Sequence, residues 1–136
     1  MNIEPKLPTG KGSPEWFTGD VYVDPIAVRK PEPSRMTVSR VRFTPGARTA
    51  WHSHEVGQTL HVTGGVALFG TRDGTVVRAT PGQTVYFPPG EEHWHGAAPE
   101  HFMEHLAMFE EAADPAATTT WLEHVTDNQY DRAGRA

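Results

Sequence analysis

The histidines of this chain are concentrated in one part of the sequence. None of the eight precedes His52, and all but His124 lie between positions 52 and 105. The stretch "WHSHEVGQTL" places His52 and His54 two residues apart and sets the amide of Gln58 four residues further on. Alternate residues of an extended strand point the same way, about 6.5 to 7 Å apart, so both histidines can converge on one ion. Gln58 can reach the same ion from the next turn or strand. These residues indicate a candidate metal site.

A longer pattern surrounds these residues, and its positions in chain order are Gly46, His52, His54, Gln58, Gly65, Gly82, Pro88, Gly90 and His93. This spacing resembles the two motifs of the cupin superfamily, joined by a short stretch, 66–81, that is typical of small bacterial cupins. In that family two histidines, an acidic or amide residue and a final histidine bind one divalent transition metal inside a β-barrel. Carried over to this chain, the resemblance implies the ligands His52, His54, Gln58 and His93.

Two positions depart from the usual cupin pattern. Ala97 stands where the second motif often ends in asparagine, and this difference is expected to affect only a turn. Gln58 stands where most cupins have glutamate, and this difference changes the chemistry of the site. Three neutral imidazoles and a neutral amide leave the charge of the ion uncompensated, which favours Lewis-acid work on a bound oxygen and counts against oxygen activation. The alternative is a three-histidine site in which Gln58 is not a ligand.

A closer resemblance covers most of the chain. The stretches "KGSPEWFTG", "FTPGARTAWHSH", "EEHWHGAAP" and "WLEHVTDNQY" resemble the bacterial cupin hydroxynitrile lyases, which contain manganese and cleave cyanohydrins. The resemblance implies Mn(II) as the metal, with Fe(II), Zn(II) or Ni(II) as alternatives, and a small-molecule substrate. It also implies the catalytic residues His95, His105 and Thr49, and the pocket residues Ser39 and Val41. Phe109 stands where those enzymes carry a glutamine that faces the pocket.

The sequence around these positions is compatible with these roles. His95 lies two residues after His93, so both side chains should point into one cavity. The stretch "HFMEHLAMF" alternates and aligns His105 and Phe109 on one face. Because neutral imidazole titrates near physiological pH, His95 or His105 can act as general acid and base, while Thr49 orients the substrate. The remaining histidines are interpreted as structural, at an interface or on the surface: His61, His101 and His124.

Two other functional classes stay open at this point, because a fold does not determine a function. One is a metal-dependent dioxygenase or isomerase of the cupin superfamily. The other is a non-catalytic ligand-binding barrel.

Short segments rich in Val, Thr and aromatic residues, separated by Gly or Pro, must position these side chains. They predict strands over 37–43, 58–62, 66–70, 75–79, 84–87 and 101–109, with "TGG" ending the second and Asp73-Gly74 turning a hairpin. The predicted fold is all-β: a single-domain cupin, a jelly-roll-like barrel over 21–130, after an arm over 1–20 and before a tail over 131–136. Thr126 and Gln129 favour a capping box for a short helical turn.

Composition limits the remaining classes. The chain has 136 residues and no cysteine, and the lack of cysteine excludes thiolate catalysis and disulfides. Its formal net charge of −5 offers no basic surface to nucleic acid or to an anionic membrane. No stretch has the roughly 18 apolar residues of a membrane span, and no leader pattern is present, so a cytoplasmic protein is expected. The exposed strand edges of a small barrel and the arm predict a homodimer or a higher homo-oligomer.

Overall fold

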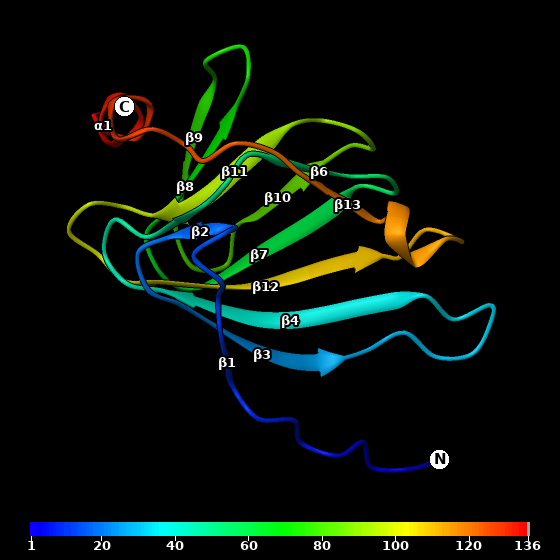
Figure 1. The fold of residues 1–136 in the computed structure, drawn as a ribbon. Coiled ribbons are helices and arrows are strands. Elements are labelled where there is room, and N and C mark those ends of the chain that lie inside the picture. The colour runs from blue at the N-terminus through cyan, green and yellow to red at the C-terminus, as the bar shows by residue number, and fades with distance from the viewer. Residues whose placement is uncertain (136) are drawn as a thin grey trace.

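The computed structural model describes residues 1–135 as two antiparallel sheets that face one another (Figure 1). The strands are β1 (Gly10–Lys11), β2 (Phe17–Thr18), β3 (Val21–Ala27), β4 (Met36–Phe43), β5 (Arg48–Thr49), β6 (His52–His54), β7 (Gln58–Gly65), β8 (Ala67–Thr71), β9 (Val76–Ala79), β10 (Thr84–Phe87), β11 (His93–Ala97), β12 (Met103–Glu110) and β13 (Thr119–Trp121). A 3₁₀ turn, η1 (Pro115–Ala117), and one helix, α1 (Asp127–Gly134), complete the fold. The last residue of the predicted tail, 136, lies outside the described residues.

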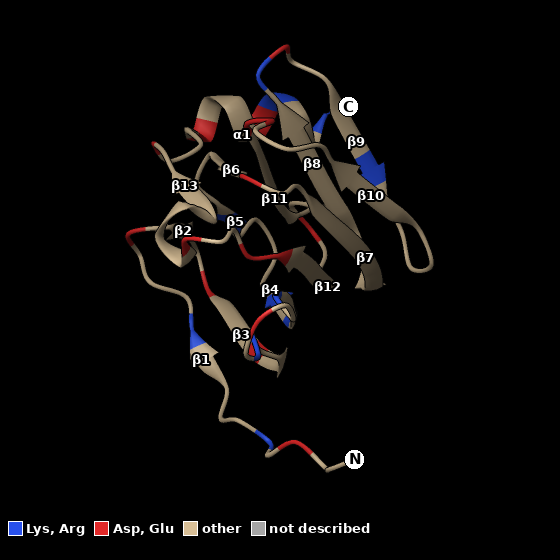
Figure 2. Cartoon of the chain, turned by 90° about the vertical axis from the view of Figure 1, so that its right-hand side faces the viewer, with Lys and Arg blue, Asp and Glu red and all other residues tan. Residues whose placement is uncertain are grey.

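The sheets place strands that are distant in the chain side by side. The first sheet has the order β1-β3-β4-β12-β7-β10. In the second, β13-β6-β11-β5-β2 form the path, and β8 joins β11 and carries β9 at its edge. The predicted all-β barrel is thereby confirmed. Strands β7, β8 and β11 carry no Lys, Arg, Asp or Glu, as Figure 2 shows, so no carboxylate projects from them into the barrel.

The predicted strands are present, and one predicted boundary is wrong. "TGG" does not end its strand, because β7 continues through Gly64 and Gly65. The register with the neighbouring β12 shifts there, because Glu104 pairs with Gly64 and His105 pairs with Val62, which leaves Thr63 of β7 as the extra residue of a bulge. Gly65 has a positive φ of 71°, and a Cβ there would lie 1.8 Å from the Phe102 carbonyl oxygen. The glycine therefore permits a close contact between strands instead of ending one.

Alternation along the strands fills the space between the sheets. Phe43, Leu60 and Val62 are fully buried there, with 0 % exposure, in one cluster with Phe69, Phe87 and Met103. Burial of each large apolar side chain contributes about 1.5 to 3 kcal/mol. The predicted metal-site histidines lie among these side chains, so they occupy the interior and not a surface.

Helix α1 packs against the outer face of the second sheet. The predicted capping box is confirmed: the Gln129 backbone N–H donates to Thr126 Oγ1, and the Thr126 N–H donates to Gln129 Oε1. The helix is longer than the single turn expected. It is anchored by the buried Arg48 guanidinium, which donates to the Val125 carbonyl, and by the Tyr130 hydroxyl, which donates to the Ala97 carbonyl at 2.6 Å.

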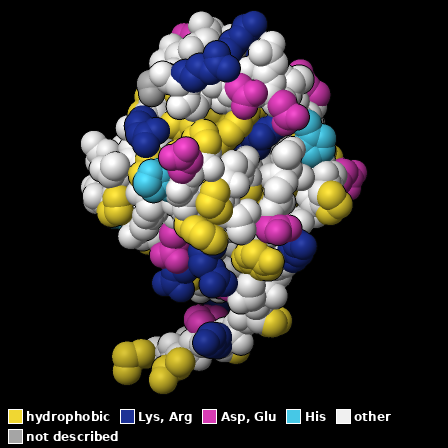
Figure 3. All heavy atoms as spheres, turned by 90° about the vertical axis from the view of Figure 1, so that its left-hand side faces the viewer, with side chains coloured by type: hydrophobic (Ala, Val, Ile, Leu, Met, Phe, Trp, Pro, Cys, Tyr) yellow, Lys and Arg dark blue, Asp and Glu magenta, His cyan; other side chains and the backbone are white. Residues whose placement is uncertain are grey.

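The N-terminal segment lies along the first sheet before it reaches the second. Gly10 pairs with Val23 through β1, and Phe17 pairs with Thr49 through β2. The residues before β1 project away from the body (Figure 1), and hydrophobic side chains are exposed at the end of this projection (Figure 3), where Ile3 is 98 % exposed. Within residues 1–135 no helix has the length and apolar character needed to cross a membrane.

Candidate metal centre

Four strands carry the polar side chains of the barrel interior. Strand β6 carries His52 and His54, β7 begins with Gln58, and β11 carries His93 and His95. His52 and His93 are directly paired between β6 and β11. All five side chains are at most 5 % exposed. The sixth polar side chain, that of His105, enters from β12 and is fully buried.

The predicted ligands lie close together. The ring centroid of His52 is 4.4 Å from that of His93 and 5.1 Å from that of His54, and Gln58 Oε1 lies 3.0 Å from His93 Nε2. The tightest set of three imidazoles differs from the predicted one, because nitrogens of His52, His93 and His95 lie within 4.8 Å of one another. His54 lies beside this set, with its ring centroid 5.8 Å from that of His93.

Hydrogen bonds on the outer side of the cluster orient three of the rings. His52 Nδ1 lies 2.9 Å from the Ala50 carbonyl oxygen, and His93 Nδ1 lies 2.9 Å from that of Glu91. Because a carbonyl oxygen only accepts, both Nδ1 atoms carry the proton, and each Nε2 lone pair faces the cavity. His54 Nδ1 lies 3.1 Å from Thr119 Oγ1, a hydroxyl that can accept a proton from Nδ1 or donate its own.

The predicted catalytic residues form a second, connected group. His95 Nδ1 and His105 Nε2 are 2.9 Å apart, so one proton is shared between the two rings. Thr49 is buried, and its hydroxyl accepts the backbone N–H of His95 at 3.2 Å. Phe43 packs against the His105 ring at 5.3 Å. The structure therefore brings the two histidines together and places Thr49 against the β11 backbone.

Known proteins resemble this chain across the strands that carry the site. The cupin domain family matches residues 39–106. The chain is 50 % identical over 124 residues to an (R)-mandelonitrile lyase of Granulicella tundricola, covering 91 % of this chain and 92 % of that protein.

This chain is a cupin.

Solved structures agree with that membership. A cupin-like protein of Thermotoga maritima superposes with a TM-score of 0.85 at 34 % identity and covers 98 % of this chain and 97 % of its own. A polyketide cyclase of Streptomyces resistomycificus superposes with a TM-score of 0.65 at 16 % identity, over 96 % of this chain and 91 % of its own. The second similarity shows the fold alone.

The donor set of this cupin fits a divalent metal. His93 Nε2 and Gln58 Oε1 both present lone pairs across 3.0 Å, an arrangement that a cation between them relieves. The Nε2 atoms of His54 and His95 are buried without any hydrogen-bond partner among the described residues. Buried lone pairs without a partner cost free energy unless a ligand satisfies them, so the cluster is built to hold an ion.

Burial keeps the imidazoles neutral. Desolvation is the main cause that lowers the pKa of His52 to about 4, of His54 to about 3 and of His93 to about 2, and the neighbouring histidines contribute to the last two shifts. Burial also lowers the pKa of His105 to about 3 and that of His95 well below its usual range. Metal binding requires neutral imidazole, so the protein environment prepares the ligands.

The predicted pocket residues lie on the first sheet. Val41 is 7 % exposed and pairs with His105 across β4 and β12, and Ser39 pairs with Ala107. The Phe109 ring stacks on the His54 ring with centroids 5.0 Å apart and an interplanar angle of 24°. The remaining histidines lie outside this group: His61 pairs with Thr84 Oγ1, and His101 and His124 are exposed.

Two residues of the site were missed from the sequence. Thr119 and Trp121 of β13 lie behind the histidines of β6, and the Trp121 ring lies 4.7 Å from the ring of His52. The Trp16 ring also stacks on that of Trp121, with centroids 5.2 Å apart. The β-branched and aromatic composition of "TTTW" is the local signal that marks this strand.

Thr119 should tune the metal affinity. Replacing Thr119 with valine removes the oxygen that holds His54 Nδ1, and loss of such a partner typically weakens metal binding by about 10- to 100-fold. Competition with a chromophoric chelator measures the affinity. Thr119→Ser should retain it, and Thr120→Val, on the exposed face of the same strand, is the matched control. Wild-type affinity in Thr119→Val would contradict the role.

The metal-free protein should lose stability in acid. The unfolded chain protonates histidines below about pH 6.5, whereas the folded chain leaves the buried ones neutral down to about pH 4, so unfolding is favoured as pH falls across that window. Each such histidine contributes a slope of about 1.4 kcal/mol per pH unit. Urea unfolding of chelator-treated protein should therefore show a shallower pH dependence in His105→Gln. His101→Gln, on the surface, should match the wild type, and equal slopes in both variants would contradict the assignment.

Proposed function

We propose that this cupin is a metal-dependent lyase that cleaves the carbon–carbon bond of a cyanohydrin, with Mn(II) as its metal. The observation that carries the proposal is the pair of neutral, buried histidines, His95 and His105, placed directly beside a metal-binding cluster that contains no carboxylate. The 50 % identity to an (R)-mandelonitrile lyase over 91 % of the chain supports the same reaction.

The proposed metal ligands are His52, His54, Gln58 and His93. The bound ion supplies Lewis-acid stabilisation to the substrate oxygen, and four neutral ligands leave its charge undiminished. Gln58 is assigned as a ligand in preference to His95 because its oxygen already lies 3.0 Å from His93 Nε2. His95 is then free for proton transfer.

His95 is the proposed base. When its Nδ1 donates to His105 Nε2, its own Nε2 presents a lone pair to the cavity, and that atom has no other partner. His95 Nε2 accepts the substrate hydroxyl proton, the oxygen electrons form the carbonyl bond, and the carbon–carbon pair leaves with cyanide. The same proton passes from His95 to cyanide, which gives hydrogen cyanide and an aldehyde. His105 shares the transient positive charge.

The remaining proposed residues shape the space around this centre. Thr49 holds the β11 backbone at His95, so it positions the base as well as lying next to the substrate. Ser39 and Val41 contribute small side chains from β4, and Phe109 covers His54 with an aromatic face. The pocket is therefore suited to an apolar or aromatic substituent on the cyanohydrin carbon.

The decisive experiment is a cleavage assay. Chelator-treated protein reloaded separately with Mn(II), Fe(II) or Zn(II) should release benzaldehyde from (R)-mandelonitrile, fastest with Mn(II). His95→Ala should lower the rate by about 10²- to 10⁴-fold while keeping the metal, as expected for loss of a general base. His101→Ala is the surface control. Absence of cleavage with every metal, or an unchanged rate in His95→Ala, would overturn the proposal, and oxygen consumption with Fe(II) would indicate the dioxygenase instead.

Phe109 should limit the rate. Phe109→Gln introduces a hydrogen-bond donor beside the reacting atoms, and one hydrogen bond to a charged transition state is worth about 1.5 to 3 kcal/mol, or roughly ten- to a hundredfold. Mandelonitrile cleavage at equal metal content should rise by at least about tenfold. Phe102→Gln, at a ring that is 68 % exposed, should change nothing. An unchanged rate in Phe109→Gln would mean that the ring serves only packing.

We also propose that the arm over residues 1–20 contributes to a homodimer. The arm contacts its own body through the Glu4–Lys30 ion pair and a Thr9–Asp24 hydrogen bond, yet it leaves Ile3 and Leu7 exposed. Exposed apolar side chains on an extended segment favour a second chain as cover. Multi-angle light scattering at micromolar concentration should give twice the mass of one chain, and Ile3→Asp with Leu7→Asp should shift it toward the monomer. A monomeric wild type would refute the proposal.

A further inference from the structure

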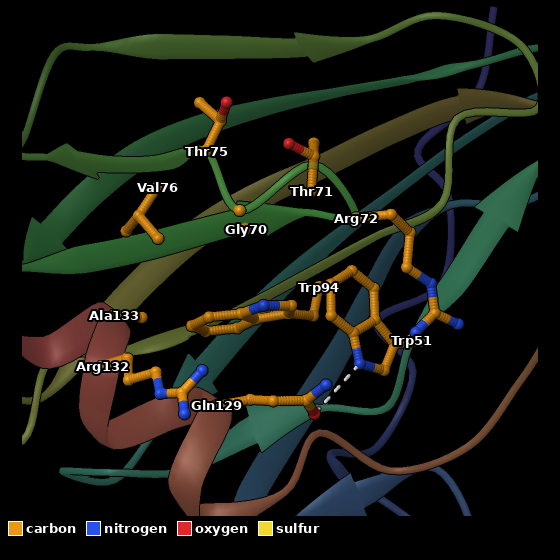
Figure 4. Close-up of a pocket in the computed structure, with 11 residues that line it drawn as sticks. Trp51, Gly70, Thr71, Arg72, Thr75, Val76, Trp94, Gln129, Arg132 and Ala133 are labelled. Atoms are coloured by element: carbon orange, nitrogen blue, oxygen red, sulfur yellow. Dashed lines mark hydrogen bonds between the residues drawn. The ribbon is translucent and has the colours of Figure 1, made fainter.

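A second cleft lies outside the barrel, on the reverse side of the metal-bearing strands. Its volume is about 500 Å³, which is within the range of small-molecule sites, and Figure 4 shows it between α1 and the β8–β9 hairpin. Trp94 projects into it from β11, whereas its neighbours His93 and His95 face the barrel interior. Trp51, next to His52, forms a second wall. The cleft is therefore separated from the metal centre by one sheet.

Two of the polar groups that line this cleft, the Gln129 amide N–H and the Trp94 indole N–H, have no acceptor among the described residues. Gln129 Oε1 accepts hydrogen bonds from the Thr126 N–H and, at 3.5 Å, from Trp51 Nε1. The amide hydrogens of Gln129 have no partner among residues 1–135. Trp94 Nε1 likewise has no hydrogen-bond acceptor among residues 1–135. The indole nitrogen packs against Gly70 (Figure 4), where a Cβ would lie 2.2 Å from it, so the absence of a side chain at Gly70 makes room for the Trp94 ring.

The side chains that line the cleft include cations and no anions, although the chain is acidic. The chain has a net charge of −5, yet the cleft is lined by two arginines and by no Asp or Glu. Arg72 already pairs with Glu92 and Glu123 and stacks on Trp51 at 4.0 Å. Arg132 forms no ion pair within the described part of the chain, so its guanidinium supplies an uncompensated positive charge at this position.

The helical wall is held in place. Residues three and four apart share one helix face, which directs Gln129, Arg132 and Ala133 toward the cleft. The capping box fixes the start of α1, and Arg48 lies over the Tyr130 ring at 4.6 Å while it holds the preceding segment. A ligand would thus meet donors that are already positioned, which lowers the entropy cost of binding.

We infer that this cleft binds a small organic anion with an aromatic ring, such as an aromatic carboxylate. The carboxylate accepts from Arg132 and from the Gln129 amide, and guanidinium groups favour this planar partner. The ring lies against the apolar wall formed by Val76, Ala133 and the edges of the indoles. This site is independent of the metal centre and of the proposed reaction.

Tryptophan fluorescence tests the inference with benzoate as the probe, because Trp51 and Trp94 both line the cleft. Benzoate should change the emission of the metal-loaded protein in a saturable way. Arg132→Glu should weaken binding by at least about tenfold, since it replaces a charge-assisted hydrogen bond by repulsion. Arg135→Glu makes the same change in charge three residues further on, outside the cleft, and should bind as the wild type does.

Two further measurements establish where benzoate binds and which of its groups is recognised. A double variant, His52→Ala with His54→Ala, removes metal ligands and should keep benzoate binding, whereas its loss would place the benzoate on the metal and overturn the inference. Benzamide, which is neutral, and inorganic phosphate, which has no ring, should each bind at least about tenfold more weakly. The inference would also be overturned if benzoate caused no saturable change in emission, if benzamide or phosphate bound as tightly as benzoate, or if Arg132→Glu bound benzoate as the wild type does.

Discussion

Neutrality of the buried imidazoles is the condition on which the rest of this cupin depends. Five histidines meet inside the barrel without a carboxylate, and a proton on any of them would place an uncompensated charge among apolar side chains. Two rings are oriented by the same local device, a carbonyl oxygen two residues earlier in the chain, at Ala50 for His52 and at Glu91 for His93. Short strands that begin at the histidine make this geometry possible, because the preceding backbone turns back toward the ring.

His52 and His54 were accessible from the sequence as a candidate metal pair because they lie two residues apart on one strand. Gln58 and His93 were implied as further ligands by the resemblance to the cupin motifs, because His93 meets His52 only through the pairing of β11 with β6. The orientation of His95 relative to His93 follows from alternation on β11.

Contacts between distant segments were not accessible. Thr119 is 65 positions from His54, and the pairing of β13 with β6 has no counterpart in local spacing. The stack of Phe109 on His54 likewise depends on the packing of two sheets, and alternation predicts only the side of β12 on which the ring lies. The early end predicted for β7 was wrong for a related reason: Gly65 is required by a neighbouring strand and not by the segment itself.

Strand β11 serves two environments at once. Its histidines face the metal centre and Trp94 faces the packing beneath α1, while Gly96 lies so close to β5 that a Cβ would meet the Ala47 carbonyl oxygen at 2.6 Å. Few substitutions are compatible with all three demands. The interior of the barrel and the outer cleft consequently share one rigid wall.

An aromatic column connects the N-terminal segment to the metal centre. Trp16 stacks on Trp121, and Trp121 packs against the ring of His52, so three rings from three segments stand in contact from the surface to the interior. Removal of Trp16 would take away the ring that stacks on Trp121, and Trp121 in turn packs against His52. Under the proposed assignment of His52 as a metal ligand, trimming the chain past Trp16 would loosen the packing of that ring, and cleavage there by a protease would weaken metal binding.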